Sequence, residues 1–167
     1  MITLGIDPAI RNTGYALLQG DHTNARCLDY GTITIPKKLP QSKALETVCS
    51  GIKNLIQKWE PDEVAVEGII YVQSHRTAIA MGAARAATLI AGASYGLRIF
   101  EYAPKKVKQA IVGKGTADKA QVAFMVRALL KLPETPPSDA ADALAIALTH
   151  LQATDPLKAR LLDRREV

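Results

Sequence analysis

The stretch MITLGIDPAIRNTGYALL, residues 1–18, decides the fold that we expect for this chain. Apolar residues alternate with small or polar ones from Ile2 to Asp7, which predicts a strand with one aliphatic face and one face that ends in a carboxylate. Pro8 ends the ladder and residues 12–18 resume a strand pattern, so we expect a hairpin with Asp7 at the end of a central strand. An Asp-Pro pair also initiates turns, and this segment alone favours that structural role for Asp7.

The length and composition of the chain indicate one compact domain. It has 167 residues, of which 48% are hydrophobic, enough for a real core. We expect the domain to span residues 1–153 and residues 154–167 to form a charged tail that frays. No basic segment followed by an apolar run opens the chain, and no uninterrupted apolar stretch reaches the about 18 residues of a membrane span. We therefore expect a cytoplasmic protein with no membrane association.

Positive charge is concentrated in one segment. The net charge is +5, and residues 98–131 hold eight basic residues against only two acids, Glu101 and Asp118. This segment could follow a polyanion such as nucleic acid. Most charged stretches only keep a surface soluble, so nucleic-acid binding needs support from other residues.

The rest of the chain alternates strand and helix patterns. We expect strands over residues 2–7, 12–18, 26–35, 62–67 and 98–102, and helices over residues 42–59, 77–95, 104–112, 118–132 and from 138 onward. This order predicts an α/β fold, with a mixed five-stranded sheet flanked by helices on both faces. The helix over residues 77–95 is rich in Ala and Gly, so it can pack closely, either on its own sheet or against a second subunit.

The expected strand over residues 62–67 ends as the first strand does. Its sequence, DEVAVE, is short and rich in valine, which predicts a buried parallel strand with Glu67 at its carboxyl end. Ala65 and Glu67 share one face of this strand, just as Gly5 and Asp7 share a face of the first. Two strands therefore end alike, each in a carboxylate.

Two further acids begin the last expected helix. Asp139 and Asp142 are three residues apart in PPSDAADALAIALTHL and so share a helix face. With Ser138 as the N-cap, the helix dipole accounts for Asp139 as a favourable acid of the first turn. Asp142 lies among Ala, Leu and Ile residues, and because an unpaired buried carboxylate is costly, its surroundings must supply a counter-charge.

The alanines of that helix would let it approach the sheet face that carries Asp7 and Glu67, so that four carboxylates converge. Without a cation these groups would repel one another and take up protons, whereas one or two Mg²⁺ ions would keep them ionised. Oxygen-only ligands suit Mg²⁺ or Mn²⁺. Two such ions about 3.5 to 4 Å apart can activate a water and stabilise the leaving oxygen of a phosphodiester.

The chain resembles the RuvC family of Holliday-junction resolvases, whose fold is ribonuclease H-like, in the order and spacing of three motifs: GIDPAIRNTGY, FEYAPKKVKQAIVGKGTADKAQV and DAADALAIALTH. The resemblance covers nearly the whole chain. It implies that the catalytic, metal-binding acids are Asp7, Glu67, Asp139 and Asp142. It also implies that Lys108 and Lys119 lie near the scissile phosphate, where point charges stabilise negative charge, although both could simply be surface residues.

The resemblance further implies the substrate and the assembly. It implies a homodimer, with two Mg²⁺ ions per subunit or Mn²⁺ in their place, that nicks two strands of a four-way DNA junction symmetrically. Two identical active sites related by a dyad match two equivalent cleavage points. Family members in bacteria act with a branch-migration motor. For DNA contacts we expect Lys105, Lys106 and Lys114 in addition to Lys108 and Lys119.

Two positions depart from the family pattern. Ala9 stands where members usually have Gly, so the turn after Asp7 must tolerate a Cβ. Ile70 stands where an aromatic residue usually wedges into the junction centre, and Tyr71 follows it. Either Ile70 acts as an apolar wedge, or Tyr71 stacks on an unpaired base, or the loop folds onto the domain.

Other functions remain open at this point. A metal-dependent nuclease of the same fold class could act on RNA or on other branched DNA with the same acids. An ATPase of the actin-like superfamily also begins with a Gly-x-Asp strand, but it needs two such lobes and this chain has material for one. In a non-catalytic junction-binding protein the acids would only cap helices and pack.

Overall fold

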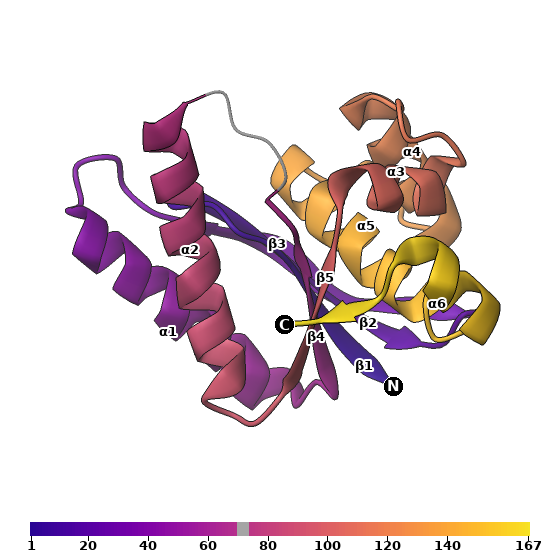
Figure 1. Cartoon of the computed structure of the whole chain (residues 1–167), viewed down its shortest axis with the longest axis horizontal. Coiled ribbons are helices and arrows are strands. Elements are labelled where there is room, and N and C mark those ends of the chain that lie inside the picture. Colours follow the sequence, from indigo (N-terminus) through magenta and orange to yellow (C-terminus); the bar gives the residue numbers. More distant parts are fainter. Residues whose placement is uncertain (70–73) are drawn as a thin grey trace.

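The structure is a computed structural model that describes residues 1–69 and 74–167. Within these residues six strands form one mixed sheet in the order β3-β2-β1-β4-β5-β6 (Figure 1). The strands are β1 (Ile2–Asp7), β2 (Asn12–Gly20), β3 (Ala25–Thr34), β4 (Glu63–Glu67), β5 (Arg98–Tyr102) and β6 (Arg165–Glu166). The helices are α1 (Gln41–Trp59), α2 (His75–Ala93), α3 (Pro104–Val112), α4 (Lys119–Leu130), α5 (Ser138–Gln152) and α6 (Pro156–Leu162).

The sheet separates two layers of helices, as expected. In Figure 1, α1 and α2 cover one face and α3 to α6 lie on the other. β1 runs antiparallel to β2 and parallel to β4, with Gly5 opposite Ala65. Because side chains alternate along a strand, Leu4 and Val64 face the α1 and α2 layer, whereas Ala65 faces α5. The register therefore places Asp7 and Glu67 at the same edge of the sheet.

Helix α2 packs on its own sheet. Ala84, Ala87 and Ala91 are buried against the sheet and α1. Ile79 and Ile90 point away from that core and are 69% and 60% exposed. We expected a buried helix because its residues are apolar almost all round. In the single chain only one side of the helix is buried.

Two glycines let α5 lie directly on the sheet. A Cβ placed on Gly5 would come within 2.5 Å of the Ala143 carbonyl oxygen and 2.7 Å of the Ala147 Cβ. A Cβ on Gly14 would clash with the Asp139 carbonyl group. This close approach confirms that the small residues of β1, β2 and α5 bring the acid-bearing helix onto the sheet.

The C-terminal segment corrects an expectation. Residues 155–167 do not fray but form α6 and β6, and β6 pairs with β5 through Phe100 and Glu166. Asp155 caps α6 by accepting a hydrogen bond from the Leu157 amide at 2.9 Å. The sheet consequently has a sixth strand. The sequence did not predict it, because a two-residue strand in a charged segment carries no periodic pattern.

No helix in the described part of the chain has the length and hydrophobicity needed to span a bilayer.

Candidate active site

A cleft of about 430 Å³ opens at the edge of the sheet where β1 and β4 end. Elements from both ends of the chain meet there, because α3, α4 and α5 close the cleft over the two strand ends. The charged side chains that line the cleft are Asp7, Glu67, Lys108, Lys119 and Asp142.

Asp7 and Glu67 lie side by side in this cleft. Ile6 pairs with Val66 in the parallel ladder, so the next residue of each strand reaches the same edge. Burial, together with the negative charge of Asp142, raises the pKa of Asp7 to about 6, against the opposing charge of Lys119. The chain therefore holds this carboxylate where water solvates it poorly.

Glu67 is perturbed in the same direction. Burial raises the pKa of its carboxyl to about 7, with added repulsion from Asp7 and Asp142. Lys119 and Lys108 oppose this rise but do not cancel it. Asp7 and Glu67, whose pKa values are raised, share the cleft with Asp142, and the three acids form a region of excess negative charge that a cation would relieve.

Asp142 and Lys119 face each other across the cleft. The Lys119 ammonium donates a hydrogen bond to Asp142 Oδ2 at 2.7 Å, and this bond raises the pKa of the lysine. Lys119 is the first residue of α4, whose N-terminus is fixed by a capping box between Asp118 and Gln121. The lysine is thus presented from a rigid helix end, while its side chain is 72% exposed.

Asp139 differs from the other three acids. It is half-buried in the first turn of α5 and does not line the cleft, although its charge contributes to the raised pKa of Asp7. Ser138 is the first residue of the helix and Pro137 occupies the N-cap position without a side-chain cap, so the expected capping role of Ser138 is wrong. In the part of the chain that the structure describes, no three His, Cys, Asp or Glu side chains gather around one point as ligands of a single ion.

Comparisons with known proteins identify the family. A family model described as crossover junction endodeoxyribonuclease RuvC matches residues 3–150. The crossover junction endodeoxyribonuclease RuvC of Akkermansia muciniphila is 63% identical over 167 residues, which is 100% of both chains. The protein of the same name from Halothermothrix orenii is 44% identical over 151 residues, covering 90% of this chain and 92% of its own.

A solved structure agrees. T. thermophilus RuvC in complex with Holliday junction substrate superposes with a TM-score of 0.89 at 33% identity, covering 100% of this chain and 99% of the other. The chain belongs to the RuvC family of crossover junction endodeoxyribonucleases. Its sheet and helix layers are those of this family's fold, and a sixth short strand is the difference from the five that we expected.

The lysines expected to contact DNA are not equivalent. Lys108 lines the cleft, whereas Lys105 and Lys114 are exposed and lie outside it. The Lys106 ammonium donates a hydrogen bond to the Leu161 carbonyl oxygen at 2.7 Å, so it holds the end of α6. Ile70 and Tyr71, the expected junction contacts of the RuvC-type loop, lie outside the described residues.

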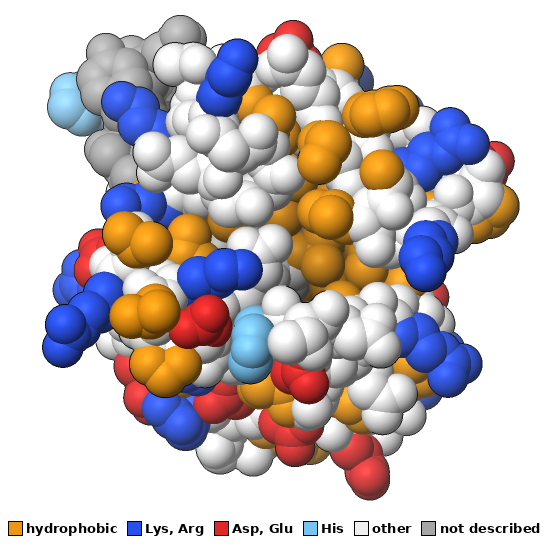
Figure 2. Space-filling model, turned by 90° about the vertical axis from the view of Figure 1, so that its right-hand side faces the viewer, with side chains coloured by type: hydrophobic (Ala, Val, Ile, Leu, Met, Phe, Trp, Pro, Cys, Tyr) orange, Lys and Arg blue, Asp and Glu red, His pale blue; other side chains and the backbone are white. Residues whose placement is uncertain are grey.

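Part of the basic segment over residues 98–131 serves the fold. Arg98 pairs with Glu63 and Glu166, and Arg127 donates to the carbonyl oxygens of Leu132 and Pro133. Figure 2 shows the side of the molecule on which α3, α4 and α6 lie, with hydrophobic side chains in a central hollow and Lys and Arg side chains toward its edges. The Lys and Arg side chains on this side therefore lie in separate groups and do not form one continuous strip.

The turn after Asp7 accommodates Ala9 in place of the usual glycine. The Thr13 hydroxyl donates to the Ala9 carbonyl oxygen at 2.5 Å, which closes the turn. The non-glycine residues with positive φ in the described chain are Glu60, Lys131 and Asp163, so the Ala9 backbone avoids the left-handed region. Its Cβ consequently costs no backbone strain.

Sequence reasoning missed an ion pair behind the cleft. Arg85 of α2 pairs with Glu101 of β5, and both side chains are mostly buried. Arg85 also lines a small pocket together with Asp7, Glu67 and Met81. The available signal was Arg85 in the middle of an alanine-rich stretch of the helix, more than two turns from Arg76 in the first turn, a placement that needs a buried partner.

Proposed function

We propose that this RuvC-family chain resolves four-way DNA junctions by metal-dependent cleavage, with its cleft acids holding one or two Mg²⁺ ions. The observation that carries the proposal is the pair of half-buried neighbours, Asp7 and Glu67, beside Asp142 in a cleft that also contains two lysines. Such an arrangement concentrates negative charge where a phosphate backbone must approach. A divalent cation resolves that conflict.

The donor set fits a hard cation. Asp7, Glu67 and Asp142 offer carboxylate oxygens only, which favours Mg²⁺, with Mn²⁺ as a substitute. Asp139 stands one helical turn before Asp142 and completes the proposed set from outside the cleft. When bound, the ions would supply an activated water and neutralise charge on the phosphate.

The side chains divide the remaining work. Asp7 and Glu67 keep the site negative and desolvated, so that it is selective for cations. Lys119 bonds Asp142 in the described structure, and we propose that it turns to the scissile phosphate when Asp142 takes a metal. Lys108 lines the same cleft and would add a second positive charge near the developing oxyanion.

The assembly follows from the substrate. A four-way junction has two equivalent strands to cut, so we propose a homodimer with its active sites related by a dyad. We also propose that the dimer works in the cytoplasm with a branch-migration motor. Lys105 and Lys114, which are exposed beyond the cleft, would contact the arms of the junction.

Cleavage of a synthetic four-way junction in Mg²⁺, with wild type beside Asp7→Asn, tests the function. We expect paired symmetric nicks in the junction and none in linear duplex, flap or RNA–DNA hybrid. Asp7→Asn should bind the junction as wild type does and leave it intact. Equal cutting of the hybrid or the flap would favour a different nuclease, and undiminished cutting by Asp7→Asn would refute the role of the acids.

A further inference from the structure

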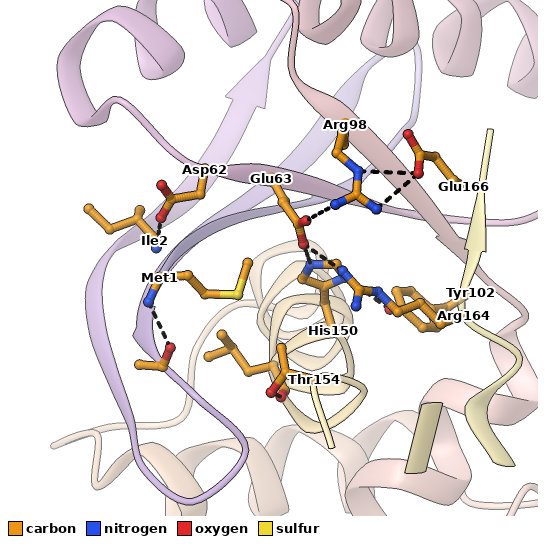
Figure 3. Close-up of polar contacts among 12 residues, drawn as sticks. Met1, Ile2, Asp62, Glu63, Arg98, Tyr102, His150, Thr154, Arg164 and Glu166 are labelled. Atoms are coloured by element: carbon orange, nitrogen blue, oxygen red, sulfur yellow. Dashed lines mark hydrogen bonds and ion pairs between the residues drawn. The ribbon is translucent and has the colours of Figure 1, made fainter. Parts of the chain in front are cut away.

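The end of β4 away from the cleft carries a second buried acid, Glu63. Figure 3 shows Glu63 joined to three side chains from different parts of the chain. Its carboxylate accepts hydrogen bonds from Arg98 at 3.1 Å, from Arg164 at 2.8 Å and from His150 at 2.7 Å. Both carboxylate oxygens of Glu63 therefore have hydrogen-bond partners within the chain.

His150 connects Glu63 to the core. The imidazole is completely buried on α5, and its Nδ1 lies 2.9 Å from the Tyr102 hydroxyl. Because Glu63 is an ionised acceptor between two guanidinium groups, His150 Nε2 must carry the hydrogen that it shares with Glu63. A neutral imidazole then accepts from the Tyr102 hydroxyl through Nδ1, and burial lowers the pKa of His150 to about 4, which keeps it neutral.

The C-terminal segment supplies the second arginine. The Arg164 guanidinium lies 4.2 Å from the centre of the Phe100 ring as well as donating to Glu63. Two residues further on, Glu166 accepts from Arg98, and β6 pairs with β5. The last residues of the chain are therefore fastened to the same acid that holds α5.

The geometry links this cluster to the cleft. His150 follows Asp142 by eight residues on α5, a rise of about 12 Å. Glu63 precedes Glu67 by four residues on β4, a span of about 13 Å. Since these lengths match and the two elements run in opposite directions, a contact between His150 and Glu63 sets where Asp142 stands relative to Glu67.

Packing alone leaves that position less well determined. Gly5 and Gly14 fix how closely α5 approaches the sheet, whereas the apolar contacts of α5 with the core are not directional. A directional hydrogen bond from a buried imidazole to a carboxylate supplies the missing restraint. The restraint in turn depends on Arg164, which holds the Glu63 carboxylate in place.

We propose that Glu63, His150 and Arg164 form a clasp, through which the C-terminal segment sets the axial position of α5 and so the metal affinity of the cleft. All three are positioning residues and touch neither substrate nor metal. The inference rests on the proposed function, because the acids must bind divalent cations for their spacing to matter.

Replacement of Arg164 by methionine tests the clasp. The side chain is 25% exposed, so the variant keeps the core intact while Glu63 loses one of its two arginines. We expect the Mn²⁺ concentration for half-saturation, measured by titration calorimetry, to rise at least about fivefold, and the Mg²⁺ requirement of single-turnover cleavage to rise in parallel. Junction affinity without divalent ions should stay unchanged, and Arg164→Lys should restore part of the metal affinity.

Two control variants separate positioning from stability. Val48→Ala removes buried methyl groups from α1, in the opposite layer, and Lys58→Met removes a surface cation that pairs with Asp29. All variants are assayed at a temperature where circular dichroism shows them folded. Neither control should change the Mn²⁺ half-saturation. An unchanged value in Arg164→Met, or an equal rise in Val48→Ala, would overturn the clasp, whereas a wild type that binds Mn²⁺ but does not cut junctions would overturn the proposed function instead.

Discussion

The two ends of β4 place the same residue type in opposite situations. Glu63 and Glu67 are four residues apart on one face of one strand, and both are covered by α5. Glu63 is matched by two arginines and a neutral histidine, whereas Glu67 faces Asp7 and Asp142, and its pKa is raised to about 7. The charge of Glu63 is neutralised by groups of the chain itself, whereas the charge around Glu67 requires an external cation.

This contrast shows how a single helix can serve both ends. α5 carries His150 over the balanced end and Asp142 over the unbalanced end. The stability gained where charges are matched offsets repulsion where they are not, so the chain can fold with a metal site that is unfavourable until it is filled.

Glu67→Gln should give the largest effect, and with opposite signs on activity and stability. Loss of one metal-binding carboxylate should lower Mg²⁺-dependent junction cleavage by about 10³-fold. The same change removes a repelled, half-buried charge, so the metal-free protein should unfold at a higher urea concentration at neutral pH. Single-turnover cleavage and urea unfolding measure the two effects.

The matched control for this variant is Glu46→Gln, an exposed residue of α1. It should leave both cleavage and unfolding unchanged. A Glu67→Gln protein that is less stable than wild type without metal would mean that Glu67 is not repelled, and the contrast between the two strand ends would fail.

Glu63→Gln breaks the balanced end and should be the most destabilising of these changes. It leaves Arg98 and Arg164 without their shared acid, and we expect a loss of about 2 to 4 kcal/mol, since partial exposure of both arginines screens the effect. Urea unfolding measures it. Adding Arg164→Met should cost less than the sum of the single changes, because the two residues act together; simple additivity would count against a connected cluster.

The pH dependence of stability should separate the two ends. Asp7 and Glu67 have folded pKa values of about 6 and about 7, above their unfolded values, so the stability present below the unfolded values is lost as pH rises through that range. His150, at about 4, has a folded pKa below its unfolded value, so its contribution is present above about pH 6.5 and lost as pH falls. The metal-free protein should therefore be most stable in mildly acidic solution.

Urea unfolding across pH, with and without Mg²⁺, provides the measurement. Between the maximum and about pH 8 we expect a loss of about 1 to 3 kcal/mol without metal. Excess Mg²⁺ should remove most of that loss and leave the acidic side unchanged, because His150 is far from the cleft. A metal effect confined to the acidic side would contradict the assignment of the two ends.

The sequence allowed one end of this comparison to be predicted and not the other. Alternation in β1 and β4 and the small residues Gly5 and Ala65 are local patterns, and they placed two strand ends together with α5 above them. Motif resemblance then singled out the acids. The clasp has no such pattern, since Glu63 lies 87 residues from His150 and 101 from Arg164 in the chain.

Two further points required the folded chain. Lys106 belongs to a basic stretch that suggested DNA contact, yet its partner is a carbonyl oxygen on a helix that we did not expect. The tail was expected to fray because charged residues without periodicity predict disorder, but ion pairs with β4 and β5 order it. Contacts between distant charged residues depend on the completed fold, which local patterns do not encode.

Glu166→Gln should produce the smallest effect and marks the edge of the balanced cluster. Its ion pair with Arg98 is largely exposed, at 51% and 57% of the two side chains, so we expect a loss below about 1 kcal/mol that disappears at high salt. The buried contacts of Glu63 with His150 and Arg164 should resist salt, since water does not reach them freely. Urea unfolding at low and high salt compares the two. A loss above about 2 kcal/mol in Glu166→Gln would shift the anchor of the C-terminal segment from the buried acid to β6 itself, because an exposed pair cannot supply that much.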